Sequence, residues 1–482
     1  MKHSLFTHHS SLFTSEALCT LLFGVAVLLF FGLAYPHHLH YQEQYQLFLF
    51  DSTYMWDIVK LPGGIADLLG RFCTQFFLFA WVGALIIALL LVTIQLLVLR
   101  LAKWGWLYGL SFVPSFLLWI FLLDENALLG GVWAVLLTLL WITGTVLMIQ
   151  FLKRKMVSRR TVPVILVLIA IPIIYWMAIG GSHYHRYPTV IPYLLYSAWL
   201  SAVILPLLMR LVVRGKWIEN SPAAKFSLTS HLLPLTTFIL VAVVMGTLVW
   251  KNANFKAEKV MQYDFMARYQ QWNRILATAN AEKPNNQIGV TVQNLALAMH
   301  GMLADHLFEY NQNGIAGLLP DIQRDATSPL PTAEAFYQLG MIYAAQRTVF
   351  EAQEAILDFQ KSARCYKRLA QTNLINGSYE VARKYLMALQ KTLFYCEWAN
   401  ETLSLLANEE AIAKHPEYGR LRQLAYDKDF YFGDHLTPEV LERLFISNTD
   451  NRLVFEYLKA YYMLTNDRES YVKLMEEVRN KK

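Results

Sequence analysis

The feature that most constrains this chain is a run of twenty mainly apolar residues, positions 231–250, with no formal charge when His231 is neutral. A helix of this length measures about 30 Å, the thickness of the hydrocarbon core of a bilayer. Lys251 follows directly, and the residues after it have the composition of a soluble protein. The run therefore predicts a membrane span that separates a transmembrane domain, residues 1–250, from a second domain, residues 251–482.

Six further apolar segments precede this run. The first, residues 17–35, could be a signal peptide, but it is long for one and has no A-x-A site before Pro36, which favours an uncleaved anchor. The weakest connection is Asp124-Glu125-Asn126, between the third and fourth segments. The sequence thus predicts an all-α, polytopic bundle of about seven spans, at residues 17–35, 76–99, 105–123, 127–151, 161–180, 189–213 and 231–250.

The formal net charge of +6 arises in the first half of the chain. Residues 1–250 contain 15 Lys and Arg against 8 Asp and Glu, whereas residues 251–482 contain 27 against 28. The excess lies in loops between apolar segments, so it does not indicate binding to nucleic acid. We expect membrane lipid and a protein as partners, and no nucleic acid.

The distribution of these basic residues predicts the orientation of the spans. Alternate loops and the N-terminus hold twelve of them, whereas the opposite loops hold only Lys60, Arg71 and Arg186. Short loops rich in Lys and Arg stay in the cytoplasm. Seven crossings from a cytoplasmic N-terminus would place residues 251–482 in the periplasm, with the spans in the bacterial inner membrane.

The first outer loop, residues 36–75, is the only long one. Its apolar spacing favours an interfacial helix over residues 45–59, followed by a turn at Pro62-Gly63-Gly64. Its carboxylates are interpreted as a solvated face; the alternative is a catalytic role for Glu43, Asp51 and Asp57. His183 and His185, in a later outer loop, could bind a metal only with further ligands.

No chemistry-bearing motif stands out elsewhere. The spans lack mid-membrane carboxylates and lysines, which disfavours an ion-coupled transporter. No GxSxG, GKS/T or GxGxxG pattern occurs, and the four cysteines have no metal spacing, so we predict no metal and no cofactor. Cys365 and Cys396 could pair in an oxidising compartment, although free thiols are favoured.

Residues 251–482 show amphipathic helical patterns. Phe336, Leu339, Gly340 and Tyr343, with Ala352 beyond, have the spacing of a tetratricopeptide repeat. The pattern recurs at Tyr366, Leu369, Ala370 and Ala382, where Gly377 marks the turn, although the period is short. The sequence therefore predicts a soluble α-solenoid, tetratricopeptide-like domain.

A non-repetitive insertion, residues 308–320, interrupts this pattern. It is interpreted first as structural; alternatively it is a binding loop or a clamp onto the transmembrane domain. The residues we expect to contact a partner are Phe308, Tyr310, Gln312 and Tyr343.

Several of these stretches resemble an uncharacterised family of bacterial membrane proteins, known only as a domain of unknown function in the Bacteroidota. The resemblance rests on residues 44–50, the Pro62-Gly63-Gly64 turn, and residues 295–298, 308–320 and 384–399. It implies no activity and no catalytic residues. The chain is also similar to polyprenyl-phosphate-sugar-dependent (GT-C type) transferases in its acidic first outer loop, but it has fewer spans and no adjacent acidic pair.

These patterns favour an inner-membrane scaffold whose periplasmic helical-repeat domain binds a protein partner in envelope assembly. The alternative is a membrane glycosyl- or lipid-modifying transferase, GT-C-like, with its site at the outer membrane surface. Its candidate catalytic residues would be Glu43, Asp51, Asp57, His183 and His185.

Overall fold

The structure is a computed structural model that describes residues 4–102, 104–154, 192–214, 229–321, 328–356, 360–426 and 438–480. These residues form helices and loops, with one isolated bridge between Asn313 and Ile315 and no β-sheet. The predicted all-α class is therefore confirmed for the described residues. The chain divides into two compact units, unit 1 (Met1–Phe255) and unit 2 (Lys256–Lys482).

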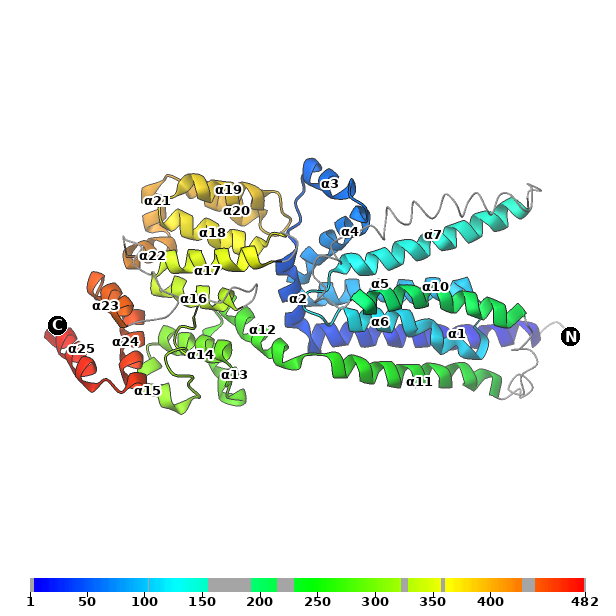
Figure 1. Ribbon diagram of the computed structural model, residues 1–482, viewed down its shortest axis with the longest axis horizontal. Coiled ribbons are helices and arrows are strands. Elements are labelled where there is room, and N and C mark those ends of the chain that lie inside the picture. Colours follow the sequence, from blue (N-terminus) through cyan, green and yellow to red (C-terminus); the bar gives the residue numbers. More distant parts are fainter. Residues whose placement is uncertain are drawn as a thin grey trace. The chain divides into compact units, whose positions relative to one another are not determined.

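Unit 1 contains five helices that are long and apolar enough to cross a membrane, at Glu16–Ala34, Ala80–Leu101, Leu129–Gln150, Tyr193–Leu211 and Leu235–Asn252. They belong to α1 (Ser4–Leu29) with its π-helical extension η1 (Phe30–Ala34), α5 (Ala80–Leu101), α7 (Leu129–Arg154), α10 (Pro192–Arg214) and α11 (Thr229–Asn252). Figure 1 shows the axes of these helices lying roughly parallel to one another. Five predicted spans thus correspond to helices of membrane length.

The other two predicted spans differ. Residues 105–123 form a 3₁₀ helix, η4 (Gly105–Phe112), followed by α6 (Val113–Phe121), so the longest apolar helix there, Leu107–Phe121, is shorter than the others. Residues 161–180 lie outside the described residues. The described part of the chain therefore supports five membrane-length helices rather than seven.

An aromatic cluster and a polar network hold the first helices of unit 1 together. The Phe23 ring lies 5.4 Å from that of Phe112 and 5.0 Å from that of Phe116. In the polar network, the fully buried Gln95 accepts a hydrogen bond from Thr20 Oγ1 (3.2 Å) and donates one to Ser111 Oγ (3.2 Å). In an apolar interior such bonds fix the register, because an unpaired polar group there would be costly.

The segment between α1 and α5 is built from short helices: α2 (Pro36–Gln42), η2 (Glu43–Tyr45), α3 (Ser52–Val59), α4 (Gly64–Thr74) and η3 (Gln75–Leu78). The expected helix over residues 45–59 is therefore shorter than predicted. Residues 46–50 have no helical structure, because Asp51 begins α3 as its N-cap, accepting from Tyr54 N at 3.0 Å. The expected turn follows at Gly63, whose φ is +79°.

His38 on α2 joins this segment to the turn after α6. Its Nε2–H donates to the carbonyl of Leu122 at 2.8 Å, and the side chain is fully buried. Burial lowers the pKa of His38 to about 4, more than the backbone hydrogen bond raises it. The imidazole is therefore neutral in the folded state at neutral pH.

This depressed pKa predicts a loss of stability in acid. The unfolded chain binds a proton at His38 near its ordinary pKa of 6.5, whereas the folded chain does not until pH 4. The stabilisation is thus complete above pH 6.5 and is lost as the pH falls toward 4, by about 2–3 kcal/mol. His38→Gln keeps a neutral donor, so thermal unfolding at pH 7 and pH 4 should show a smaller acid loss in this variant. Parallel pH profiles for the two proteins would contradict the prediction.

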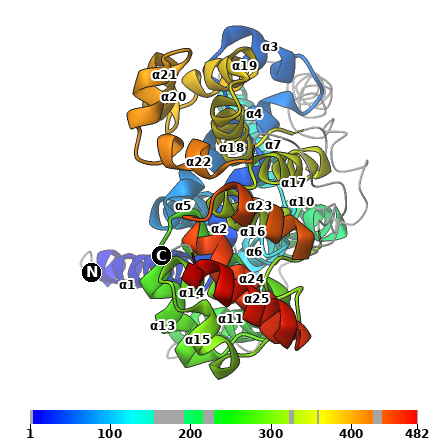
Figure 2. The same ribbon diagram turned by 90° about the vertical axis from the view of Figure 1, so that its left-hand side faces the viewer.

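Unit 2 is a set of antiparallel helix pairs. Its helices are α12 (Phe255–Arg268), α13 (Trp272–Glu282), α14 (Gln287–Met299), α15 (Leu303–His306), η7 (Leu307–Glu309), α16 (Pro329–Leu339), α17 (Ile342–Ala355), α18 (Ala363–Ile375), α19 (Tyr379–Gln390), α20 (Cys396–Leu405), α21 (Glu409–Lys414), α22 (Tyr418–Leu424), α23 (Pro438–Ser447), α24 (Arg452–Thr465) and α25 (Arg468–Asn480). Figure 2 views this unit end-on, with α22 beside α18.

One turn geometry recurs between paired helices of unit 2. A residue with positive φ ends the first helix at Gln270, Gly340, Gly377 and Asn466, and the second helix begins two residues later. In each turn the next residue's N–H bonds to a carbonyl five residues back, as for Met341 N to Phe336 O at 2.9 Å. This Schellman arrangement satisfies the last carbonyls of the first helix. The predicted turn at Gly377 is therefore confirmed.

The inner helices of unit 2 carry its core. Every residue of α16 is buried, and Phe336, Leu339 and Ala352 of the predicted repeat pattern are fully buried. The later helix α22 packs on α16 and α18, where Arg422 donates to the carbonyls of Leu374 and Ile375 at 3.0 and 3.2 Å. The end of α18 is thus capped by a side chain from a distant helix.

Candidate partner-binding site

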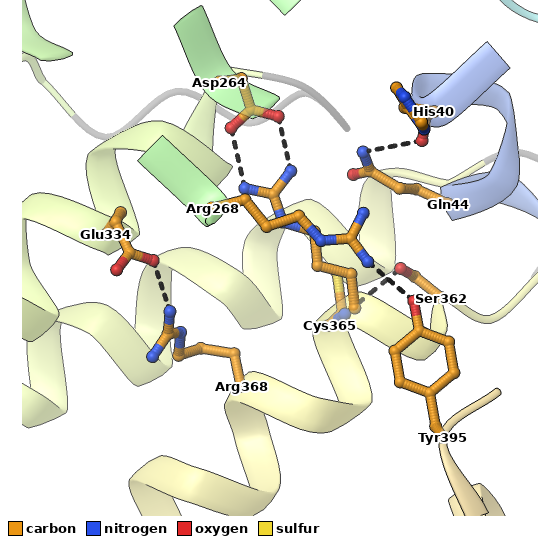
Figure 3. A network of polar contacts seen from close by, with 10 residues as sticks. His40, Gln44, Asp264, Arg268, Glu334, Ser362, Cys365, Arg368 and Tyr395 are labelled. Atoms are coloured by element: carbon orange, nitrogen blue, oxygen red, sulfur yellow. Dashed lines mark hydrogen bonds and ion pairs between the residues drawn. The ribbon is translucent and has the colours of Figure 1, made fainter. Parts of the chain in front are cut away.

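Four basic side chains gather on α12 and α18 of unit 2: Arg268, Arg364, Lys367 and Arg368, which we call the cationic cluster. Three of them lie at spacings of three and four residues on α18, which places them on one face of that helix. Figure 3 shows part of this region, with Glu334 and Arg368 facing each other.

Arg364 is neutralised by Asp264 of α12. Its two terminal nitrogens donate to the two carboxylate oxygens at 2.5 and 2.8 Å, and both side chains are about one-tenth exposed. This is a bidentate pair in fork geometry. It joins two helices that are a hundred residues apart in sequence.

Arg368 is neutralised in a second chain of contacts. It pairs with Glu334 of α16, and its guanidinium lies 3.7 Å from the centroid of the Tyr337 ring. Tyr337 donates its hydroxyl proton to Glu417 at 2.9 Å. Burial raises the pKa of Tyr337 well above its ordinary value, which keeps the phenol protonated as a donor.

Lys367 has a different environment from Arg364 and Arg368. Its Nζ lies 4.7 Å from the centroid of the half-buried Trp398 ring, and it forms no ion pair among the described residues. Burial and the charges of Arg268 and Arg368 together lower the pKa of Lys367 to about 8, although the carboxylates of Glu417 and Glu334 act in the opposite direction. A neighbouring anion would stabilise this ammonium, because it lies half-buried among other cations.

Aromatic side chains border Lys367 and Arg268. Arg268 Nη2 donates to the hydroxyl of Tyr395 at 2.7 Å, and its guanidinium carbon lies 5.4 Å from the centroid of the Tyr269 ring. Arg, Trp and Tyr are the side chains that most often dominate binding energy at protein interfaces. The cationic cluster with Tyr395 and Trp398 therefore has the chemistry to bind a carboxylate-bearing segment.

This cluster was not predicted, although the sequence of α18 contains a signal for it. Arg364, Lys367 and Arg368 share one face of a helix, a pattern that normally indicates a solvated surface. Only the fold brings Asp264, Glu334 and Trp398 to that face, and these pairings cannot be derived from sequence spacing.

The four residues expected to contact a partner lie in two settings. Phe308 is 67% exposed, and Tyr343 on α17 is 37% exposed. Tyr310 donates to Asn280 Oδ1 at 2.7 Å, and Gln312 exchanges hydrogen bonds with Asn294 at 2.9 and 3.2 Å. Phe308 and Tyr343 are thus accessible, whereas Gln312 holds the insertion onto α14.

The candidate catalytic carboxylates of unit 1 have three different local roles. Asp51 caps α3, and the exposed Asp57 pairs with Lys60 at 2.6 Å. Glu43 is a buried residue of η2. His183 and His185 lie outside the described residues. Among the residues that the structure describes, no group of three His, Cys, Asp or Glu could hold a metal ion.

Cys365 and Cys396, whose pairing was left open, are both free thiols. Cys365 is buried at the start of α18, where Ser362 Oγ accepts from its backbone N–H at 3.2 Å. Cys396 is partly exposed at the start of α20, where its thiol donates to the carbonyl of Leu393 at 3.4 Å.

Comparison with known proteins gives one match. A family described as a family of unknown function (DUF6057) matches residues 10–482 of the chain. No curated protein and no solved structure matches.

Proposed function

Because the chain belongs to the DUF6057 family of unknown function, we propose from its own geometry that it is a membrane-anchored scaffold whose unit 2 binds an acidic segment of a protein partner at the cationic cluster. The observation that carries the proposal is the half-buried Lys367, lying over Trp398 beside two further cations. We further propose that unit 1 crosses the bacterial inner membrane seven times and delivers unit 2 to the periplasm.

The ends of α1 and α11 support an odd number of crossings. Asn254, just after α11, donates its N–H to the hydroxyl of Tyr35 at 3.0 Å, and Tyr35 follows the first span directly. The chain therefore leaves α11 at the same end of unit 1 at which it leaves the first span. Since the first span begins at the other end, Asn254 and the start of the first span lie at opposite ends of unit 1, which supports an odd number of crossings.

The short segment at residues 105–121 is long enough in space to cross. A 3₁₀ helix rises about 2.0 Å per residue, so η4 and α6 together extend about 30 Å. Trp104, before η4, donates to the carbonyl of Leu99 near the end of α5, whereas Leu122, after α6, accepts from His38. These contacts lie at opposite ends of the first two spans, as a crossing requires.

The ends of α7 and α10 support the predicted span at residues 161–180. Gln42 donates to the carbonyl of Ala127 just before α7, so α7 begins at the outer end and finishes at the other. Arg210, near the end of α10, donates to the carbonyl of Leu101 at 2.6 Å, so α10 also runs from the outer end inward. Two successive helices in the same direction are the arrangement that a further span at residues 161–180 would produce, which supports this part of the proposal.

The orientation follows from the loop charges and can be tested with fusions at Lys482. The side of Arg100 carries most of the basic residues, which favours the cytoplasm for that side. Alkaline phosphatase fused after Lys482 should be active, and a fluorescent protein that folds only in the cytoplasm should be dark. The reverse pair of results would place unit 2 in the cytoplasm and contradict this part of the proposal.

The helix pairs of unit 2 support the tetratricopeptide-like description. Four of them share one turn geometry, and the small residue Ala352 packs at the predicted repeat position. Such arrays bind proteins through side chains displayed on consecutive helices. Here the accessible side chains on these helices are Lys367 of α18, Trp398 of α20 and Tyr343 of α17.

In-cell photocrosslinking tests the docking proposal. A photoreactive residue at the exposed Glu401, one helical turn after Trp398, should give a discrete adduct with a partner in the full-length protein. Lys367→Gln should weaken this adduct by about fivefold, the ratio that corresponds to the roughly 1 kcal/mol of one ionic contact.

The matched control is Lys384→Gln, on the exposed face of α19, which makes the same change outside the cluster. It should leave the adduct unchanged. Equal effects of the two substitutions would overturn the assignment of the cluster. Failure to form any adduct from both position 401 and position 308, at normal protein level, would count against a protein partner.

A further inference from the structure

An apolar groove runs between α1 and α5 of unit 1. Its volume is about 710 Å³, and apolar side chains such as Leu21, Val25 and Leu89 line most of it. These three side chains are 63%, 40% and 57% exposed, so the groove opens on the outside of the bundle. Three polar lining residues, Glu16, Thr20 and Arg100, distinguish it from an ordinary helix–helix seam.

The register of the two helices places both charges at one end of this groove. A Cβ at Gly24 would lie 3.0 Å from Val92, a Cβ at Gly32 would lie 2.6 Å from the Trp81 ring, and Thr20 bonds to Gln95. As the residue number increases along α1, the number of the contacting residue on α5 decreases, so the two helices are antiparallel. Continuing this register toward the N-terminus brings Glu16 opposite Arg100.

Both charges lack an ionic partner in the part of unit 1 that the structure describes. Among the described residues, Glu16 and Arg100 form no ion pair with each other or with another side chain. Thr20, by contrast, is already bonded to Gln95 and Tyr108 at 3.2 Å each. The groove thus presents one carboxylate and one guanidinium at its mouth, with an apolar channel behind them.

The channel has the length of one lipid acyl chain. From Glu16 to Leu28, a helix extends about 18 Å, against about 15 Å for half of a hydrocarbon core. Arginine binds phosphate in a bidentate manner, and a carboxylate attracts an ammonium group. An amine-bearing phospholipid carries both groups next to each other, directly above its acyl chains.

We propose that the groove between α1 and α5 is a specific site for one phosphatidylethanolamine-type phospholipid. Arg100 binds its phosphate, Glu16 binds its ammonium group, and Leu21, Val25 and Leu89 enclose one acyl chain. The lipid lies in the leaflet on the side of Arg100. A lipid with the same phosphate but no amine leaves Glu16 without a partner, and it is therefore bound less well.

Native mass spectrometry of the full-length protein tests this site. Protein stripped of lipid in detergent is titrated separately with phosphatidylethanolamine and phosphatidylglycerol that carry identical acyl chains. The wild type should prefer phosphatidylethanolamine by about fivefold, which corresponds to about 1 kcal/mol for one ionic contact. Equal retention of the two lipids, or a preference for the anionic one, would overturn the proposal.

Three variants separate the contacts. Glu16→Gln should abolish the preference, while Arg100→Gln should weaken the binding of both lipids. Leu21→Trp should fill the groove and weaken both, whereas Leu240→Trp is the matched control, because Leu240 is 65% exposed on α11 and outside the groove. If Leu21→Trp binds lipid as the wild type does, no acyl chain occupies the groove.

Folding of these variants is checked by thermal unfolding in the same detergent. The hydroxyl of Tyr108 donates to the backbone carbonyl of Glu16 at 2.8 Å, so Glu16→Gln leaves this interior bond in place. Arg100 is exposed, and Leu21 projects outward from α1. Unfolding temperatures should therefore match the wild type, and the lipid preference reports on binding alone.

Discussion

Replacing Arg364 with leucine is expected to destabilise unit 2 by about 3–5 kcal/mol, because it leaves the Asp264 carboxylate buried without its partner. Both carboxylate oxygens accept from Arg364, and the two side chains are 9% and 10% exposed. With nine-tenths of the carboxylate side chain buried, water replaces the two lost hydrogen bonds only in part. The effect should be far larger than that of an exposed ion pair.

The double variant Asp264→Leu with Arg364→Leu separates the pair from its surroundings. Removing both charges removes the unpaired carboxylate, so most of the lost stability should return. The control is Lys414→Ala, which breaks the exposed pair with Glu410 on α21 and should cause no measurable change.

Hydrogen exchange of the full-length protein is the appropriate measurement. Amides of α12 and α18 should exchange much faster in Arg364→Leu than in the wild type, whereas those of α5 in unit 1 should not change. A change of less than 1 kcal/mol in the opening free energy of the α12 and α18 amides would show that the pair does not hold these helices together.

The local features of this fold were predictable from the sequence, because they arise from local physics. An apolar run such as residues 231–250 has no alternative to a helix once it lies in a bilayer, since its backbone groups have no other partners. Gly377 was identified as a turn because a left-handed backbone favours glycine. Both inferences need only neighbouring residues.

The candidate site depends on contacts that no local pattern contains. Gln312 looked suited to a partner, but Asn294 of α14 lies beside it and takes its hydrogen bonds. The spacing of Lys367 on α18 would fit one charge on a solvated face, but the ring centroid of Trp398 on α20, in the next helix pair, lies 4.7 Å from its ammonium group. Asp51 looked available for catalysis, whereas the start of α3 uses it as a cap.

A second large effect is expected at Gly340, in the turn between α16 and α17. Its φ is +86°, and a Cβ there would lie 2.9 Å from the backbone oxygen of Leu424 and 3.0 Å from the backbone carbon. Gly340→Ala therefore combines left-handed backbone strain with a clash against the end of α22. We expect a loss of about 3 kcal/mol or more in the free energy of unfolding of unit 2.

Gly377 provides a control that removes only the clash. It has φ of +77° in the same Schellman arrangement, but nothing lies within 4 Å of the Cβ position. Gly377→Ala should cost only the backbone strain, about 1–2 kcal/mol. The difference between the two variants in chemical unfolding then measures how tightly α22 packs on the α16 turn. Equal losses would mean that α22 moves aside at little cost. The hydrogen bonds from Arg422 to the end of α18 would then contribute little to holding α22 in place.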